Sequence, residues 1–230
     1  MDFNKGLKDG IPVALGYFSV SIAFGLMAIE NECSALEAVL ISVTNLTSAG
    51  QFAGVTVLAA MGTYVEMAMT QLVINSRYSL MAISLSQKVD GKFRGVWKWL
   101  LGFAITDEIF AVAIGHDGSI SKEYFSGLIS LPILGWSAGT FFGAVLGNIM
   151  PEIITTSLGI ALYGMFIAVV VPKARENRHV LITVILAIII STVIRYVPVF
   201  SGISAGFAII ISAVIASVAG AVFFPVKEAE

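Results

Sequence analysis

The stretch LEAVLISVTNLTSAGQFAGVTVLAAM, residues 36–61, decides the fold class of this chain. It exceeds the roughly 20 residues that a membrane-crossing helix needs, and Glu37 is its only charge. In its middle, the segment from Asn45 to Gln51 places polar side chains and a glycine at membrane depth. Free backbone N–H and C=O groups are tolerated there only if they face protein or a water-filled cavity. The stretch therefore predicts a membrane helix that breaks at a polar site.

The rest of the chain has the same apolar character. Hydrophobic residues make up 57% of the 230 positions, charged residues 12%, and the mean hydropathy is +0.93. This composition excludes an ordinary soluble domain. The other stretches of spanning length are residues 11–29, 64–85, 97–115, 125–150, 153–171, 180–199 and 202–224. Their lengths favour helices over barrel strands, so we predict an all-α integral membrane protein with about eight helical stretches in one transmembrane domain.

The distribution of charge predicts the topology, because short cytoplasmic loops collect Lys and Arg. The basic segments, which we place on the cytoplasmic side with both termini, are residues 5–8, 88–98, 173–178 and 227. The acidic connections, which we place outside, are residues 30–37 and 117–123. Eight simple crossings do not satisfy this assignment. It is satisfied if the second and sixth stretches, residues 36–61 and 153–171, are broken or re-entrant and return to the side from which they came.

A faint internal repeat supports treating these two stretches alike. Gly25 matches Gly139, and the segment 50–52 matches 164–166 at the same offset. We therefore predict two pseudo-repeat halves, about 1–115 and 116–230. Three crossings and one re-entrant stretch in each half would place the halves in opposite orientations, an inverted repeat used by many secondary transporters.

The break in the second stretch supplies the first candidate binding residues. An interrupted helix presents unpaired N–H groups and a positive dipole end to an anion such as a carboxylate. The candidates are Asn45, Ser48, Gly50 and Gln51. The alternative is that the hydroxyls of Thr47 and Ser48 only bond back to their own helix.

The third and fourth stretches carry charges, each of which costs roughly 2.5 to 3.5 kcal/mol at mid-membrane on insertion scales. On the third stretch we predict substrate contacts from Asn75, Arg77 and Tyr78, because the arginine fork suits a carboxylate. On the fourth, Asp107 and Glu108 point about 100° apart on a helix. One would pair with Arg77, and the other would meet a substrate amine or a coupling proton. The alternative is an ion pair that only fastens helices.

Other functional classes find no support in the sequence. It contains no P-loop, HExxH motif or serine nucleophile elbow, and no clustered metal ligands. We therefore predict no enzymatic activity, cofactor or metal, and the net charge of −2 gives no reason to expect a nucleic-acid partner. Glu66 and Glu152 lie near the ends of stretches and are expected at the membrane interface.

Several segments resemble the AzlC-type branched-chain amino-acid permease family. They are residues 11–17 (IPVALGY), 49–52 (AGQF), 75–81 (NSRYSLM), 106–111 (TDEIFA) and 164–168 (GMFIA). The resemblance implies an inner-membrane exporter of branched-chain amino acids that works with a small AzlD-type membrane subunit. The chain departs from the family at Tyr78, where many members carry His, so the resemblance implies no titrating role at that position.

These observations lead to one hypothesis and two alternatives. The hypothesis is a secondary transporter that exports branched-chain amino acids, with Arg77 and the break holding the carboxylate and with Asp107 or Glu108 meeting the amine or a proton. A channel would use the same broken stretches but would show flux without saturation. A non-transporting assembly subunit would need the charges only for docking.

Overall fold

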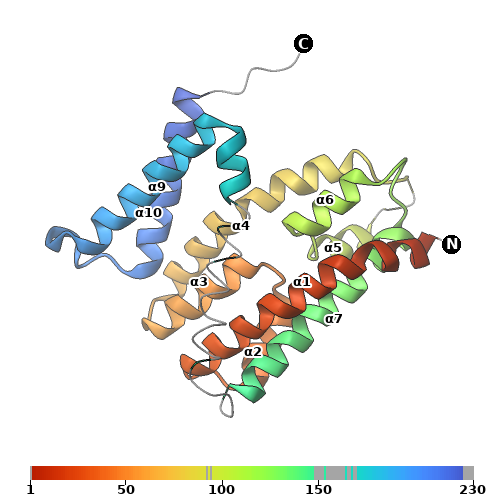
Figure 1. Cartoon of the computed structure of the whole chain (residues 1–230), viewed down its shortest axis with the longest axis horizontal. Helices are drawn as coiled ribbons and strands as arrows, with labels where there is room; N and C mark the ends of the chain where they lie inside the picture. Colours follow the sequence, from red (N-terminus) through yellow and green to blue (C-terminus); the bar gives the residue numbers. More distant parts are fainter. Residues whose placement is uncertain are drawn as a thin grey trace. The chain divides into compact units, whose positions relative to one another are not determined.

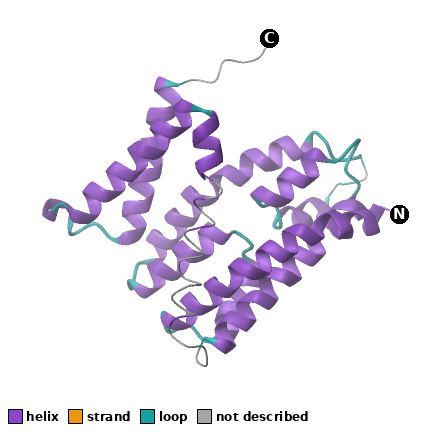
Figure 2. Cartoon of the chain, in the orientation of Figure 1, coloured by secondary structure: helices purple, strands orange, loops and turns teal. Residues whose placement is uncertain are grey.

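The computed structural model describes residues 2–91, 93, 95–147, 153, 164, 167 and 170–224. Their secondary structure is helical, apart from one isolated bridge between Val89 and Ile120 (Figure 2), and this confirms the predicted all-α class. The helices are α1 Asp2–Glu30, α2 Ala35–Thr44, α3 Ser48–Ala59, α4 Tyr64–Ser86, α5 Val96–Gly102, α6 Asp107–Gly115, α7 Lys122–Leu146, α9 Arg178–Tyr196, the 3₁₀ turn η1 Pro198–Phe200, and α10 Ala205–Phe223. Among these residues, α1, α7, α9 and α10 are long and apolar enough to cross a membrane.

The chain forms two compact units. Unit 1 holds residues 1–52 and 75–161, and unit 2 holds residues 53–74 and 162–230. Both α3 and α4 begin in one unit and end in the other. The predicted pseudo-repeat halves are a different division of the chain, and they stay a prediction.

The centre of unit 1 is a close pair formed by α1 and α7, which lie side by side (Figure 1). Glycines on α7 make this approach possible: a Cβ added at Gly135 would lie 2.5 Å from the carbonyl oxygen of Ala14, and one at Gly143 would meet the carbonyl of Ile22. These glycines of α7 thus pack directly against a neighbouring backbone, as small residues do between membrane helices.

The two helices of this pair run parallel. Contacts advance in the same direction along both, from Gly6 against Tyr124 to Gly25 against Thr140. The inverted repeat predicted from matched residues requires these helices to run in opposite directions. At this pair the prediction of opposite orientations is therefore wrong, and the fold of the fourth stretch is the reason.

The fourth stretch, residues 97–115, is not the single crossing that its apolar length predicts. It forms α5 and α6, helices of 7 and 9 residues, which at 1.5 Å per residue reach about 11 and 14 Å, well short of a hydrocarbon core of about 30 Å. After α6, Ile120 N–H donates to the Lys88 carbonyl at 2.9 Å, and Asp90 N–H donates to the Ile120 carbonyl at 2.9 Å. The fourth stretch therefore leaves this end of unit 1 after residue 95 and returns to the same end before residue 120.

This return changes the predicted topology at one connection. Ser121 Oγ donates to Asp2 Oδ2 at 3.0 Å, so the start of α1, the basic segment at Lys88 and the connection around Asp117 all lie at one end of unit 1. The first two were predicted to share a side, and they do lie together. The prediction that the Asp117 connection lies on the opposite side is wrong, because the fourth stretch turns back and α7 then leaves in the direction of α1.

The second stretch is broken where the polar run predicted it. Helix α2 ends at Thr44 and α3 begins at Ser48. Asn45 Oδ1 accepts hydrogen bonds from the Thr47 backbone N–H at 3.3 Å and from Thr47 Oγ1 at 3.0 Å, a local alternative to helical bonding. The predicted break in the sixth stretch, residues 153–171, lies almost entirely outside the described residues, as does Glu152.

Unit 2 contains the antiparallel neighbours α9 and α10 and a buried carboxylate. Glu66 is only 4% exposed, and its Oε1 accepts from the Gly206 N–H at 2.9 Å and from the Ser204 hydroxyl. Glu66 lies in the first turn of α4, near the end of its stretch as expected; its level in a membrane stays a prediction, and its side chain does not face solvent. Its carboxylate instead satisfies N–H and hydroxyl donors at the start of α10, where a helix dipole favours negative charge.

Candidate functional site

An ion pair joins α4 to α6 in unit 1. Arg77 Nη1 donates to Asp107 Oδ2 at 2.5 Å, and the two side chains are 41% and 28% exposed. Arg77 Nη2 also donates to the Tyr78 hydroxyl at 3.0 Å, and the guanidinium carbon lies 4.8 Å from the Tyr78 ring centroid. Tyrosine therefore orients the guanidinium by a hydrogen bond and a cation–π contact, while the pair itself stays open to a ligand.

The two predicted carboxylates diverge, as adjacent helical residues should. Asp107 turns to Arg77, whereas Glu108 Oε2 accepts from the Tyr17 hydroxyl at 2.8 Å. The Tyr17 hydroxyl also hydrogen-bonds Thr106 Oγ1, which caps α6 by accepting from the Ile109 N–H at 3.4 Å. Both carboxylates thus occupy the first turn of α6, where the helix dipole stabilises negative charge.

The glutamine of the broken stretch is held entirely by protein. Gln51 is 1% exposed. Its Oε1 accepts from Trp136 Nε1 at 3.1 Å and from Ser42 Oγ at 3.3 Å, and its Nε2 donates to the Asn45 carbonyl. Because one end of this amide bonds α7 and the other bonds the break, Gln51 fixes the shape of the interruption.

The remaining candidates in the break differ in exposure. Asn45 and Ser48 are half-buried, and Gly50 is buried within the first turn of α3. The Thr47 hydroxyl donates to Asn45 Oδ1, a bond to a side chain within the break. The hydrogen bonds that hold Asn45 and Gln51 within the break do not involve the Ser48 hydroxyl among the described residues.

Aromatic packing joins the two groups of residues. The rings of Tyr17 and Trp136 meet edge to face, with centroids 5.3 Å apart, so the tyrosine that bonds Glu108 packs on the indole that bonds Gln51. The structure therefore brings the break and the carboxylates of α6 into one network. Asn75 is half-buried on α4 two positions before Arg77, a spacing that places it on a different face of the helix.

Sequence reasoning missed the residues that connect the network. Tyr17 lies in segment 11–17, and neither Tyr17 nor Trp136 was assigned a role from the sequence. Both are nearly buried, at 7% and 1% exposure. A buried Tyr or Trp needs a partner for its polar atom, but the sequence does not specify which partner. Within the described part of the chain, no three His, Cys, Asp or Glu residues gather as a metal site would require.

Comparison with known proteins places this network in a family. The AzlC family, described as AzlC protein, matches residues 12–150, which include every residue of the site described above. The chain belongs to the AzlC family. No solved structure matches it.

Curated relatives of this AzlC-family chain are membrane proteins. The inner membrane protein YgaZ of Escherichia coli K12 is 27% identical over 188 residues, covering 79% of this chain and 77% of YgaZ. An uncharacterized membrane protein of Archaeoglobus fulgidus is 26% identical over 180 residues, covering 77% and 78%. The branched-chain amino acid transport protein AzlC of Bacillus subtilis is 23% identical over 181 residues, covering 77% of this chain and 70% of that protein.

Proposed function

We propose that this AzlC-family protein is a secondary transporter that exports branched-chain amino acids across the inner membrane, together with a small AzlD-type membrane subunit. The accessible ion pair between Arg77 and Asp107 carries the proposal, together with Glu108 beside it on Tyr17. A guanidinium and two carboxylates on neighbouring helices complement the carboxylate and ammonium groups of a free amino acid. The name of the Bacillus subtilis relative, a branched-chain amino acid transport protein, supports the same class of substrate.

The ion pair serves as the resting state of the empty site. A charge without a partner is costly in an apolar environment, so Arg77 and Asp107 neutralise each other while no substrate is bound. An amino acid exchanges with them: its carboxylate takes the fork of Arg77, and its ammonium group takes Asp107. Each charge then changes partner and is never left alone, while apolar walls receive the aliphatic side chain.

The other residues complete the site. The start of α3, with Asn45, Ser48 and Gly50, offers a second contact for the substrate carboxylate at a helix N-terminus. Gln51 acts by holding the break in shape, and Asn75 and Tyr78 position the arginine helix. Glu108, held by Tyr17, is the group to which we assign the coupling proton. We further propose that the second stretch is re-entrant, because it is interrupted at this site.

Leucine efflux from preloaded vesicles that contain the protein and its small partner tests the proposal. Arg77→Lys keeps the charge but loses the fork, and we expect efflux to fall about tenfold, the equivalent of about 1.4 kcal/mol. The matched control is Glu123→Gln, which removes the 3.7 Å pair with Lys122 elsewhere in unit 1 and leaves efflux unchanged.

A charge exchange separates substrate binding from a fastening role. The double variant Arg77→Asp with Asp107→Arg restores an ion pair but presents the charges on the wrong helices. We expect it to fold and to bind the partner subunit without transporting leucine. Restored efflux would show that the pair only holds α4 to α6. Flux that neither saturates nor shows counterflow would favour a channel, and loss of partner binding alone would favour an assembly subunit.

A further inference from the structure

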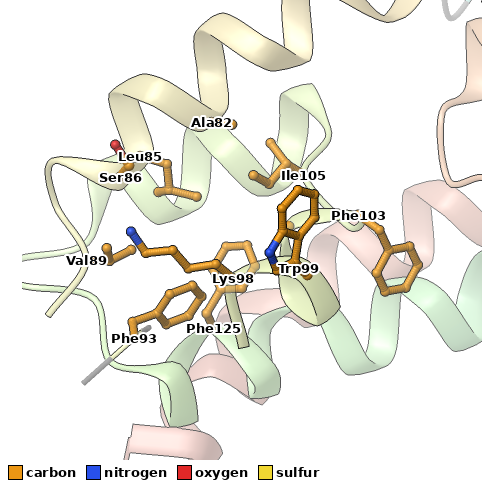
Figure 3. A pocket seen from close by; sticks show the side chains of 11 residues that line it. Ala82, Leu85, Ser86, Val89, Phe93, Lys98, Trp99, Phe103, Ile105 and Phe125 are labelled. Atoms are coloured by element: carbon orange, nitrogen blue, oxygen red, sulfur yellow. The ribbon is translucent and has the colours of Figure 1, made fainter. Parts of the chain in front are cut away.

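An apolar cavity lies in unit 1 apart from the charged network. Its volume is about 440 Å³, and it is enclosed by the end of α4, by α5 and by the start of α7, within the 300–1,000 Å³ typical of ligand sites. Figure 3 shows its walls, which include the rings of Phe93, Phe103 and Phe125. None of the residues proposed to bind the amino acid lines it.

The polar groups of the cavity define the charge of its ligand. Lys98 is the one charged side chain among the described residues that line it, and in Figure 3 it reaches across the cavity toward Val89. The other polar groups are the indole N–H of Trp99 and the hydroxyl of Ser86, which donates to the carbonyl of Ile83 at 2.7 Å. No described carboxylate in the lining could pair with an ammonium group, so the cavity suits an anion with an apolar chain and does not suit a zwitterionic amino acid.

The residues around the cavity are of the kinds that gather at a membrane–water interface. Trp97 and Trp99 on α5 are 43% and 84% exposed, and tryptophan concentrates at the level of lipid headgroups. A second cation lies nearby, since Lys122 Nζ is 5.1 Å from the centroid of the Trp97 ring. The same end of unit 1 holds the basic segment at Lys88, and a lysine near an anionic membrane surface attracts lipid by about 1 kcal/mol.

From this geometry we propose that the cavity is a binding site for an anionic phospholipid of the bilayer. One acyl chain enters between α4, α5 and α7 along the phenylalanine rings, and the headgroup phosphate meets the ammonium group of Lys98. Trp99, which lines the cavity and is largely exposed, lies at the opening. The site stands independently of the proposed transport activity, because it shares no residue with the charged network.

Quenching of tryptophan fluorescence by brominated lipids tests the site. The protein is reconstituted in phosphatidylcholine vesicles that contain a small fraction of either dibrominated phosphatidylglycerol or dibrominated phosphatidylcholine. The signal that disappears in Trp99→Phe isolates Trp99 from the other two tryptophans. We expect the anionic lipid to be preferred about fivefold, the equivalent of the 1 kcal/mol expected for one lysine. Equal quenching by the two lipids would overturn the proposal.

Variants distinguish a built site from general attraction to the surface. Lys98→Gln should abolish the preference for phosphatidylglycerol, whereas Lys122→Gln, which changes the same charge outside the cavity lining, should keep it. Ala82→Leu, which fills the cavity, should reduce quenching by both lipids, and it also serves if Lys98→Gln fails to fold. Equal effects of the two lysine variants would refute the cavity site. Stronger quenching by dibromostearate than by the phospholipid would assign the cavity to a free fatty acid and overturn our choice of ligand.

Discussion

The Tyr17 hydroxyl donates a hydrogen bond of 2.8 Å to Glu108 Oε2, across 91 positions of sequence. The same hydroxyl bonds the Thr106 cap of α6, and the same ring packs on Trp136. One side chain therefore holds the carboxylate turn of α6 and contacts the indole that fixes the broken stretch. Its position makes it the most informative residue to change.

Tyr17→Phe should reduce leucine efflux while leaving the chain folded. The ring still packs on Trp136, but Glu108 loses a hydrogen bond, and bonds to charged groups contribute about 1.5 to 3 kcal/mol. We expect efflux to fall by about tenfold or more. Tyr124→Phe is the control, because it removes a tyrosine hydroxyl that donates to Asp9 at 2.8 Å in the same unit. Comparable losses in the two variants would count against a role for Tyr17 at the site.

Gln51→Leu should destabilise the chain, because it leaves the buried Trp136 Nε1 without its acceptor, while Ser42 Oγ keeps only its bond to Thr140 Oγ1. A buried group that loses its partner costs about 1 to 3 kcal/mol. We expect the midpoint of thermal unfolding to fall. It is measured in detergent by monitoring tryptophan fluorescence. Gln87→Leu changes the same side chain at an exposed position and should leave the midpoint near that of the wild type. An unchanged midpoint for Gln51→Leu would show that the amide does not hold the break.

The return of the fourth stretch predicts which residues label from one side of the membrane. In a Cys33→Ser background, Asp117→Cys and Lys5→Cys should react with an impermeant maleimide from the same side, because both lie at one end of unit 1. Wild-type Cys33, beyond the other end of α1, should react from the opposite side. If position 117 reacted from the same side as Cys33, the fourth stretch would be the single crossing that the sequence predicted.

Thiol labelling of Cys33 should depend on pH in a defined direction. Partial burial, and secondarily the charge of Glu37, raise the pKa of the Cys33 thiol above its ordinary value. The reactive thiolate is therefore scarce at neutral pH, and the labelling rate should keep rising as pH exceeds the ordinary thiol pKa. Glu37→Gln should speed labelling at neutral pH, since it removes the negative charge, while Glu32→Gln should change the rate less. A labelling rate that levels off at neutral pH would contradict a raised pKa of the Cys33 thiol.

Gly206→Ala should destabilise unit 2. A Cβ at this position would lie 2.6 Å from Glu66 Oε1 and 2.8 Å from Thr70 Oγ1, so the buried carboxylate could not keep its bond to the start of α10. Overpacking of this kind costs about 1 to 3 kcal/mol. Gly202→Ala, which meets nothing within 4 Å, is the matched control. Equal unfolding midpoints for the two variants in detergent would show that Glu66 tolerates displacement.

Parts of the site could be predicted from sequence because the membrane penalises each of them individually. The polar run from Asn45 to Gln51 cannot continue as an ordinary apolar helix, and Arg77 needs an opposite charge wherever it lies. The pairing of Arg77 with one carboxylate of α6 was therefore anticipated, although the choice of Asp107 over Glu108 was not. That choice depends on how α6 is rotated, which the Tyr17 hydroxyl and the Thr106 cap fix together.

The sequence by itself determined that this chain is a helical membrane protein, where its second stretch breaks, and which charges require partners, because hydrophobic length and the cost of buried charge are local properties. Only the tertiary structure decided that residues 97–115 turn back, that α1 and α7 run parallel, and that Tyr17 and Trp136 join the break to Glu108. A short helical pair and a crossing helix have the same apolar composition. They differ in backbone bonding between distant segments, such as Lys88 with Ile120, which no local pattern contains.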